Sequence, residues 1–133
     1  MLNHKYIILD RDGVINHDSS AYIKNPQEWR PIKRSLEAIS LLTKNSYRIL
    51  LLSNQAGVSR GIIKYEDLIQ IHNKLISSCL EHGGKIFSTH YCYDHPDSNS
   101  TKRKPQPGMY LEIADRLGIN LSDVFAIGDS PKD

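Results

Sequence analysis

The sequence predicts a single α/β domain over residues 1–133, a Rossmann-like parallel sheet with helices on both faces. Short apolar runs alternate with segments of helical periodicity along the whole chain, as in successive βαβ units. Three of these runs end abruptly in polar clusters. A chain of 133 residues is long enough for one compact core and too short for two.

Four apolar runs predict the strands, at residues 6–9, 48–52, 86–93 and 124–127. Their apolar residues are consecutive rather than alternating, which is typical of strands buried on both faces of a parallel sheet. Three helices are expected between these strands. The first begins at Pro31 and has an apolar face at Leu36, Ile39 and Leu42. The second covers residues 65–80, and the third begins at residue 107 and ends at Gly118.

The segments between these elements are polar and contain Gly and Pro. Within the loop over residues 13–31, Trp29 is expected to anchor the chain to the core. The chain stops six residues after the fourth strand, where a covering helix normally follows. We therefore expect a fold truncated after that strand, with a bare sheet edge.

Composition excludes several classes of function. The formal charge of +2 is close to balance and no basic stripe is present, so no nucleic-acid partner is expected. Cys79 and Cys92 form no paired framework, which suits a reducing compartment. The first residues lack the features of a signal peptide, and no apolar run approaches the roughly 20 residues of a membrane span. The sequence thus predicts a cytoplasmic protein with no membrane partner.

The polar clusters after three strands carry the chemistry. They are Asp10-Arg11-Asp12-Gly13, Ser53-Asn54-Gln55 and Gly128-Asp129-Ser130. Because ligands of parallel α/β sheets bind beyond the carboxyl ends of the strands, these clusters should meet at one edge. Asp10, Asp12, Asp129 and Asp133 would then crowd together, and carboxylates in such a group need a hard cation such as Mg²⁺.

Phosphoryl transfer suits this arrangement. A single Asp after a strand is more often a turn residue or helix cap, but three at three strand ends favour a site. Asp10 can attack phosphorus and form an aspartyl phosphate, and Asp12 can protonate the leaving oxygen and then activate water. Ser53, Asn54 and Lys104 would supply donors and positive charge for the phosphoryl oxygens.

Four short motifs resemble those of the haloacid dehalogenase (HAD) superfamily phosphatases, in the same order. They begin at Asp10, Ser53, Arg103-Lys104-Pro105 and Gly128. Within that superfamily, the strings Asn54-Gln55-Ala56-Gly57-Val58-Ser59-Arg60-Gly61 and Arg103-Lys104-Pro105-Gln106-Pro107-Gly108-Met109 are similar to the D,D-heptose 1,7-bisphosphate phosphatases. The histidinol-phosphate phosphatases share much of this pattern.

The resemblance implies a role for each motif residue. Asp10 is expected to be nucleophile and Mg²⁺ ligand, Asp12 the acid/base with its carbonyl on the metal, and Asp129 a further ligand. Ser53 and Lys104 would hold the phosphoryl group. The substrate, a small phosphorylated heptose losing its C7 phosphate, would be bound by Arg11, Asp18, Ser19, Ser20, Tyr22, Asn54, Gln55, Arg60, Arg103 and Ser130.

The chain departs from that family in the segment before Arg103. Family members carry a zinc loop of Cys and His, whereas here Cys92-Tyr93-Asp94-His95 keeps the first Cys and the later pair is absent. Tetrahedral zinc needs four N or S ligands, so structural zinc is not expected, and Cys92 is predicted to be a buried strand-end thiol. We also expect no large cap domain over the site, and a monomer.

Three alternatives remain open from the sequence. One is a histidinol-phosphate phosphatase and another is an inactive fragment that binds phosphate without turnover. The third is a signalling receiver domain, which also combines an α/β fold with Asp and Mg²⁺. Receivers place the phosphorylated Asp after a later strand, whereas here the Asp-x-Asp-Gly cluster follows the first.

Overall fold

The computed structural model describes residues 4–133, so the predicted absence of a signal peptide concerns residues that lie partly outside this range. The helices and strands in chain order are β1 (Lys5–Leu9), α1 (Ser35–Lys44), β2 (Tyr47–Asn54), α2 (Tyr65–Glu81), β3 (Ile86–Cys92), α3 (Gly108–Leu117) and β4 (Phe125–Ile127). Short 3₁₀ helices stand at Pro26–Glu28 and Leu121–Asp123. Within the described residues, no helix is long and apolar enough to cross a membrane.

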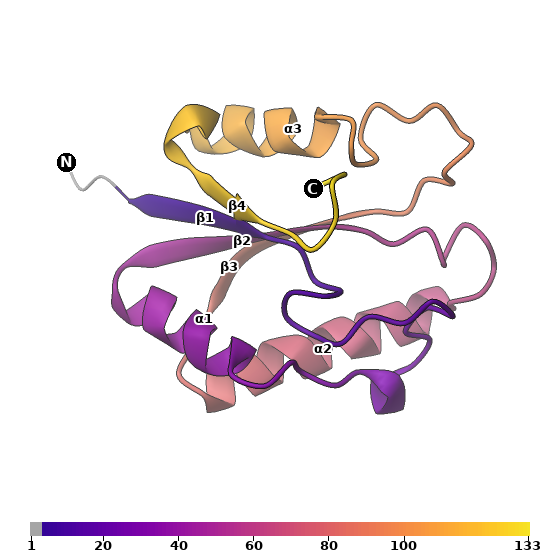
Figure 1. Ribbon diagram of the computed structural model, residues 1–133, viewed down its shortest axis with the longest axis horizontal. Coiled ribbons are helices and arrows are strands. Elements are labelled where there is room, and N and C mark those ends of the chain that lie inside the picture. Colours follow the sequence, from indigo (N-terminus) through magenta and orange to yellow (C-terminus); the bar gives the residue numbers. More distant parts are fainter. Residues whose placement is uncertain (1–3) are drawn as a thin grey trace.

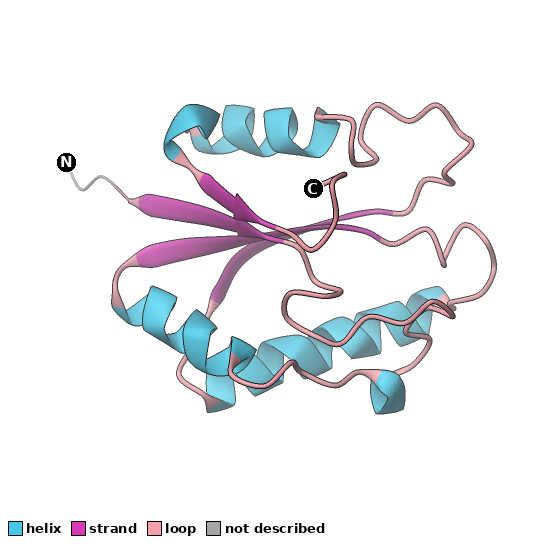
Figure 2. Cartoon of the chain, viewed as in Figure 1, coloured by secondary structure: helices cyan, strands magenta, loops and turns pink. Residues whose placement is uncertain are grey.

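The four strands form one parallel sheet in the order β3-β2-β1-β4. Helices α1 and α2 cover one face of this sheet and α3 covers the other (Figures 1 and 2). The predicted Rossmann-like fold with helices on both faces is therefore confirmed. Because all strands run the same way, the residues that follow β1, β2 and β4 reach the same edge of the sheet.

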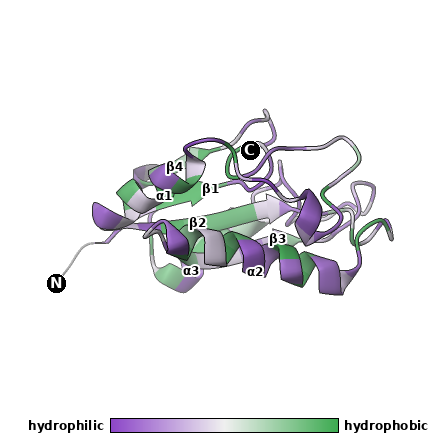
Figure 3. Cartoon of the chain, turned by 90° about the horizontal axis from the view of Figure 1, so that it is seen from below, coloured by the Kyte–Doolittle hydropathy of each residue, from purple (hydrophilic) through white to green (hydrophobic). Residues whose placement is uncertain are grey.

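Consecutive apolar residues in the strands serve two cores, because successive side chains point to opposite faces. Ile7 and Leu9 pack toward α1 and α2, whereas Ile8 packs toward α3. Leu50 and Leu51 divide in the same way and are fully buried. Hydrophobic residues accordingly gather along the sheet, with hydrophilic ones on the outer faces of the helices and in the loops (Figure 3).

The fourth strand differs from the buried strand that the sequence predicted. Within the part of the chain that the structure describes, β4 pairs with β1 alone, in the register Leu9↔Ile127, and lies at the edge of the sheet. Phe125 remains 73% exposed and Ile127 48% exposed. This exposure agrees with the expected bare sheet edge, whereas the apolar run by itself had indicated a strand buried on both faces.

The loop before α1 also differs from the prediction. The helix begins at Ser35 rather than at Pro31, because Arg34 has a φ of +73° that a right-handed helix cannot accommodate. The backbone N–H of Ile32 instead donates to the carbonyl of Ile15. The prediction for Trp29 is confirmed, since its ring is buried and Lys74 of α2 donates to its carbonyl at 3.0 Å.

Candidate active site

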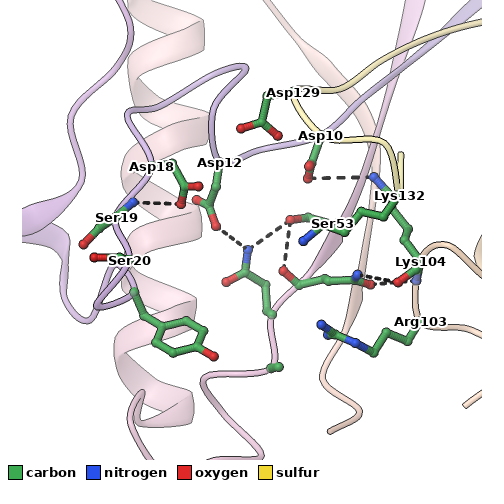
Figure 4. A pocket seen from close by; sticks show the side chains of 14 residues that line it. Asp10, Asp12, Asp18, Ser19, Ser20, Ser53, Arg103, Lys104, Asp129 and Lys132 are labelled. Atoms are coloured by element: carbon green, nitrogen blue, oxygen red, sulfur yellow. Dashed lines mark hydrogen bonds and ion pairs between the residues drawn. The ribbon is translucent and has the colours of Figure 1, made fainter. Parts of the chain in front are cut away.

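A pocket of about 260 Å³ opens at the carboxyl edge of the sheet (Figure 4). It lies where the loops after β1, β2 and β4 meet the loop before α3. The residues that line it are Asp10, Asp12, Asp18, Ser19, Ser20, Tyr22, Ser53, Asn54, Gln55, Ala56, Arg103, Lys104, Asp129 and Lys132. The lining is predominantly polar and carries charges of both signs.

Asp10 stands at the floor of this pocket, immediately after the buried strand β1. Its Oδ1 accepts a 2.8 Å hydrogen bond from the backbone N–H of Arg11, and the Nζ of Lys104 lies 3.8 Å from the same oxygen. Burial raises the pKa of Asp10 to about 6, against the opposing influence of the Lys104 ammonium. Asp10 is therefore a buried carboxylate that lines the pocket beside a buried ammonium group.

Two further carboxylates converge beside Asp10, those of Asp129 (Figure 4) and of Asp133. One oxygen from each of Asp10, Asp129 and Asp133 lies within 4.8 Å of the others. Gly13 makes room for this group, because a Cβ there would lie 1.9 Å from Oδ2 of Asp129. An all-oxygen set of carboxylates with space around it fits Mg²⁺ or a similar hard cation. Among the described residues, no other group of three His, Cys, Asp or Glu ligands comes together in this way.

Asp12 is held by hydrogen bonds on both carboxyl oxygens. Its Oδ1 accepts from Nε of Arg11 at 3.0 Å and from Nδ2 of Asn16 at 2.9 Å. Its Oδ2 accepts only a longer 3.3 Å bond from Nε2 of Gln55. The same Gln55 nitrogen donates to Oγ of Ser53 at 3.0 Å, so the end of β1 is tied to the end of β2.

Lys104 reaches the pocket from the loop before α3. Its ammonium is 2% exposed and pairs with Oδ1 of Asp133 at 2.8 Å. Burial alone would raise the pKa of Asp133, but the hydrogen bond and positive charge of Lys104 hold it below its ordinary value. The Asn54 amide donates to the Lys104 carbonyl and accepts from its N–H, at 3.1 and 3.0 Å. Asn54 therefore fixes the backbone that presents the lysine.

Arg103 precedes Lys104 on the same loop and also faces the pocket. Its Nη1 is buried and has no protein partner, which leaves a donor for an anionic ligand. The Oγ of Ser100 accepts hydrogen bonds from the backbone N–H groups of Lys102 and Arg103 and donates to Oδ2 of Asp94. We refer to Asp94, Ser100 and these two N–H groups as the loop clasp.

Comparison with known proteins identifies the family. A family model described as polynucleotide kinase 3 phosphatase matches residues 5–132. The D-glycero-beta-D-manno-heptose-1,7-bisphosphate 7-phosphatase of Bordetella bronchiseptica is 43% identical over 129 residues, covering 97% of this chain and 72% of the relative. The chain belongs to the heptose-1,7-bisphosphate 7-phosphatase family.

Other members of the heptose-1,7-bisphosphate 7-phosphatase family agree. The Pseudomonas putida enzyme is 43% identical, over 97% of this chain and 74% of the relative. The crystal structure of D,D-heptose 1,7-bisphosphate phosphatase from B. bronchiseptica, complexed with magnesium and phosphate, superposes with a TM-score of 0.94 at 42% identity. The superposition covers 96% of this chain and 72% of the B. bronchiseptica chain. The resemblance to HAD superfamily phosphatases is thereby confirmed.

Most of the site residues that the sequence predicted lie in the pocket of this heptose-1,7-bisphosphate 7-phosphatase family member. Twelve of them line it: Asp10, Asp12, Asp18, Ser19, Ser20, Tyr22, Ser53, Asn54, Gln55, Arg103, Lys104 and Asp129. Three predicted substrate contacts are not among the lining residues. Arg60 is exposed on the loop after β2, and Ser130 binds Asp133 through its backbone N–H. Arg11 is fully buried beneath the pocket.

Sequence reasoning missed three contributors to the site. Lys132 and Ala56 line the pocket, and Asn16 is buried and donates to Asp12. Asp133 was expected in the acidic group but was assigned no role; it is the ion-pair partner of Lys104. Its spacing of four residues after Asp129, in a turn after a strand, was the available signal. No pattern in the sequence marks Ala56 or Asn16.

Proposed function

We propose that this chain is a Mg²⁺-dependent phosphatase that removes the C7 phosphate of D-glycero-D-manno-heptose 1,7-bisphosphate. The observation that carries the proposal is the geometry around Asp10. A buried carboxylate stands at the end of β1, with a buried lysine 3.8 Å away and two further carboxylates beside it. The names of the family members, which are heptose-1,7-bisphosphate 7-phosphatases, support this substrate.

In the first step, a carboxyl oxygen of Asp10 attacks phosphorus and the bond between phosphorus and the C7 oxygen breaks. The electron pair of that bond stays on the C7 oxygen, which takes a proton from Asp12. The products are the sugar alcohol and an aspartyl phosphate on Asp10. Ser53 and Lys104 donate to the phosphoryl oxygens as charge develops on them.

In the second step, the carboxylate of Asp12 takes a proton from water, and that water oxygen attacks the aspartyl phosphate. The acyl–phosphate bond breaks, the electron pair returns to Asp10, and inorganic phosphate leaves. Both steps use Asp12, as acid and then as base, so its position relative to Asp10 decides both rates. The two residues leave the same strand end and are separated by Arg11.

Mg²⁺ would be held by Asp10, Asp129 and the backbone carbonyl of Asp12. The bound cation supplies neutralisation of charge between the nucleophile and the phosphoryl oxygens. The convergence of Asp10 and Asp129 oxygens supports this assignment. Lys104 holds Asp133 in an ion pair, which keeps the lysine directed at the space beside Asp10.

The sugar would be recognised from two sides of the pocket. Arg103 has a buried Nη1 with no protein partner, suited to a sugar phosphate or hydroxyl. The loop that carries Asp18, Ser19, Ser20 and Tyr22 lines the opposite side and offers further polar groups. We further propose a cytoplasmic monomer without structural zinc, acting in carbohydrate metabolism that supplies heptose for lipopolysaccharide.

Phosphate release from a panel of esters tests this proposal. The panel contains the heptose 1,7-bisphosphate, histidinol phosphate and 4-nitrophenyl phosphate, each with Mg²⁺ and with Asp10→Asn as the control. We expect Asp10-dependent release from the heptose bisphosphate at a kcat/KM far above that of the other two. Preference for histidinol phosphate would assign the chain to that second activity. A folded protein inactive on all three esters would contradict the proposal.

A further inference from the structure

Arg11 occupies an unusual position for a residue between two site aspartates. Its side chain is fully buried beneath the pocket floor, so it cannot contact a substrate in this structure. One nitrogen, Nη1, is buried without a partner. A buried arginine with an unsatisfied nitrogen costs free energy that an apolar residue would not, so a role in stability does not explain it.

The other guanidinium nitrogens contact two residues of the site. Nε and Nη2 of Arg11 both lie 3.0 Å from Oδ1 of Asp12. Nη2 also donates to Oε1 of Gln55 at 3.1 Å. The guanidinium carbon lies 5.7 Å from the ring centroid of Tyr91 on β3, within the range of a cation–π contact. Arg11 thus joins residues from the ends of β1 and β2.

This contact decides the orientation of the Gln55 amide. Because the Gln55 amide oxygen accepts from Arg11, the amide nitrogen of Gln55 is directed away from the guanidinium. It donates there to Oδ2 of Asp12 at 3.3 Å and to Oγ of Ser53 at 3.0 Å. A guanidinium can hold a carboxylate and an amide oxygen at once, because its N–H donors are fixed in one plane. The ammonium of a lysine is a single nitrogen and cannot reproduce this planar arrangement of donors.

The two oxygens of Asp12 are consequently unequal. Oδ1 is occupied by Arg11 and by Asn16, whereas Oδ2 has only the long contact with Gln55. Oδ2 is therefore the oxygen that can carry a proton toward the pocket. We propose that Arg11 is a positioning residue, which locks Asp12 through Oδ1 so that Oδ2 faces the leaving oxygen of the ester.

This inference rests on the proposed function only in taking Asp12 as the acid and base. The proton on Oδ2 moves to the leaving oxygen as the bond between that oxygen and phosphorus breaks. It is replaced in the second step from the attacking water. Arg11 donates no proton and touches no substrate, so its effect should depend on how strongly the leaving group needs a proton.

Two esters separate this role from a general structural one. A sugar alkoxide needs protonation to leave, whereas 4-nitrophenolate does not. For Arg11→Lys and Arg11→Met, we expect single-turnover cleavage of the sugar phosphate to slow by roughly 30-fold or more. The burst of nitrophenolate, which reports formation of the aspartyl phosphate alone, should stay within about threefold of wild type.

Arg116→Lys and Arg116→Met are the matched controls, because Arg116 is an exposed arginine of α3 whose one ion-pair partner among residues 4–133 is Glu112. Both should leave the two rates unchanged. Gln55→Leu removes the second arm of the network while keeping Arg11. It should reproduce the selective loss on the sugar phosphate, and it decides the question if neither Arg11 variant folds.

Equal slowing of the two esters, or no slowing of either, would overturn the inference. Failure of the proposed substrate gives a different pattern. A wild-type protein that ignores the heptose bisphosphate but cleaves another sugar phosphate contradicts the substrate alone. The Arg11 comparison is then made with that ester against 4-nitrophenyl phosphate, with the same expected ratio.

Discussion

The two strands that carry the acidic residues of the site differ sharply in how they are supported. β1, which leads to Asp10, has a neighbour on each side, and its apolar residues are buried on both faces. β4, which leads to Asp129, is three residues long, pairs only with β1 and is exposed at every position. Asp10, the proposed nucleophile, therefore rests on the core, whereas Asp129, the proposed metal ligand, rests on the sheet edge.

This difference indicates which half of the site is preformed. Asp10, Ser53 and Lys104 are buried and connected by hydrogen bonds or ion pairs to central elements. Asp129 is exposed, and its place depends on the pairing of β4 with β1. We expect a cation shared by Asp10 and Asp129 to stabilise that pairing, because ligands that bind only the folded arrangement favour it.

The largest effect should come from truncating a central strand. Leu50→Ala on β2 removes a fully buried side chain and should lower the free energy of unfolding by about 3 kcal/mol. Ile127→Ala on the edge strand should lower it by only about 0.5 kcal/mol, because that side chain is half exposed. Urea unfolding of both variants measures the contrast. Similar losses would mean that β4 is buried in solution.

A second prediction concerns Gly13, where the loop after β1 contacts Asp129 after β4. Gly13→Ala places a Cβ 1.9 Å from Oδ2 of Asp129, at a residue with a φ of +81°. Displacement of Asp129 should weaken Mg²⁺ binding and lower kcat/KM by about 100-fold. Enzyme assays over a range of Mg²⁺ concentrations measure both effects.

Gly61→Ala is the matched control for backbone strain. Gly61 has a similar φ of +71°, but no atom lies within 4 Å of the position of its Cβ. This variant should lose about 1 kcal/mol of stability and keep its activity. Equal loss of activity in the two alanine variants would show that strain, rather than contact with Asp129, explains the Gly13 effect.

The sequence was sufficient for the order and direction of the elements. The runs at 6–9 and 48–52 are consecutive β-formers, and such runs are buried on both faces wherever they lie in a parallel sheet. The sequence was insufficient for the start of α1, because neither the left-handed conformation of Arg34 nor the hydrogen bond from the Ile32 N–H to the Ile15 carbonyl leaves a local pattern. The sequence was likewise insufficient for the place of β4 beside β1 in the sheet order, because an apolar run does not specify the neighbours of its strand.

A third prediction concerns the pH dependence of stability without Mg²⁺. Burial raises the pKa of Asp10 to about 6, so the fold favours its protonated form. That contribution is present at pH 4 and is lost as pH rises through 6. Relative to Asp10→Asn, the unfolding free energy of wild type should fall by about 2 kcal/mol between pH 4 and 7.

Thermal or urea unfolding at several pH values in chelator measures this difference. The control Asp115→Asn changes an exposed aspartate of α3 and keeps Asp10, so its unfolding free energy should fall with pH as that of wild type does. In saturating Mg²⁺ at pH 7, wild type should have a higher free energy of unfolding than Asp10→Asn, because only wild type keeps the full set of ligands. A constant difference between wild type and Asp10→Asn across this pH range would contradict the raised pKa.

The smallest effect is expected at the loop clasp. Ser100→Ala removes the acceptor for the backbone N–H groups of Lys102 and Arg103. The KM for the heptose bisphosphate should rise about threefold at constant kcat, since a net hydrogen bond contributes about 1 kcal/mol or less at an exposed position. Ser98→Ala, which removes only a bond to the carbonyl of His95, should leave KM unchanged.

The candidate site was predictable where one motif supplies both the residue and its role. Asp10, Asp12 and Asp129 follow strands, and their convergence follows from a parallel sheet. Arg11 was expected among the substrate contacts, whereas in the structure it contacts Asp12 and two residues far along the chain, Gln55 and Tyr91, 44 and 80 positions away. Nothing local in the sequence distinguishes a buried arginine that orients an acid from an exposed one that binds an anion.

Trapping the covalent intermediate tests the central claim most directly. Asp12→Asn should accept the phosphoryl group of 4-nitrophenyl phosphate on Asp10 but fail to activate water for its release. Acid quenching and peptide mass spectrometry should then find one phosphoryl group on the peptide that contains Asp10, absent from the Asp10→Asn/Asp12→Asn double variant. Nitrophenolate release by Asp12→Asn without any phosphoryl group on that peptide, or with the group on another residue, would contradict Asp10 as the nucleophile.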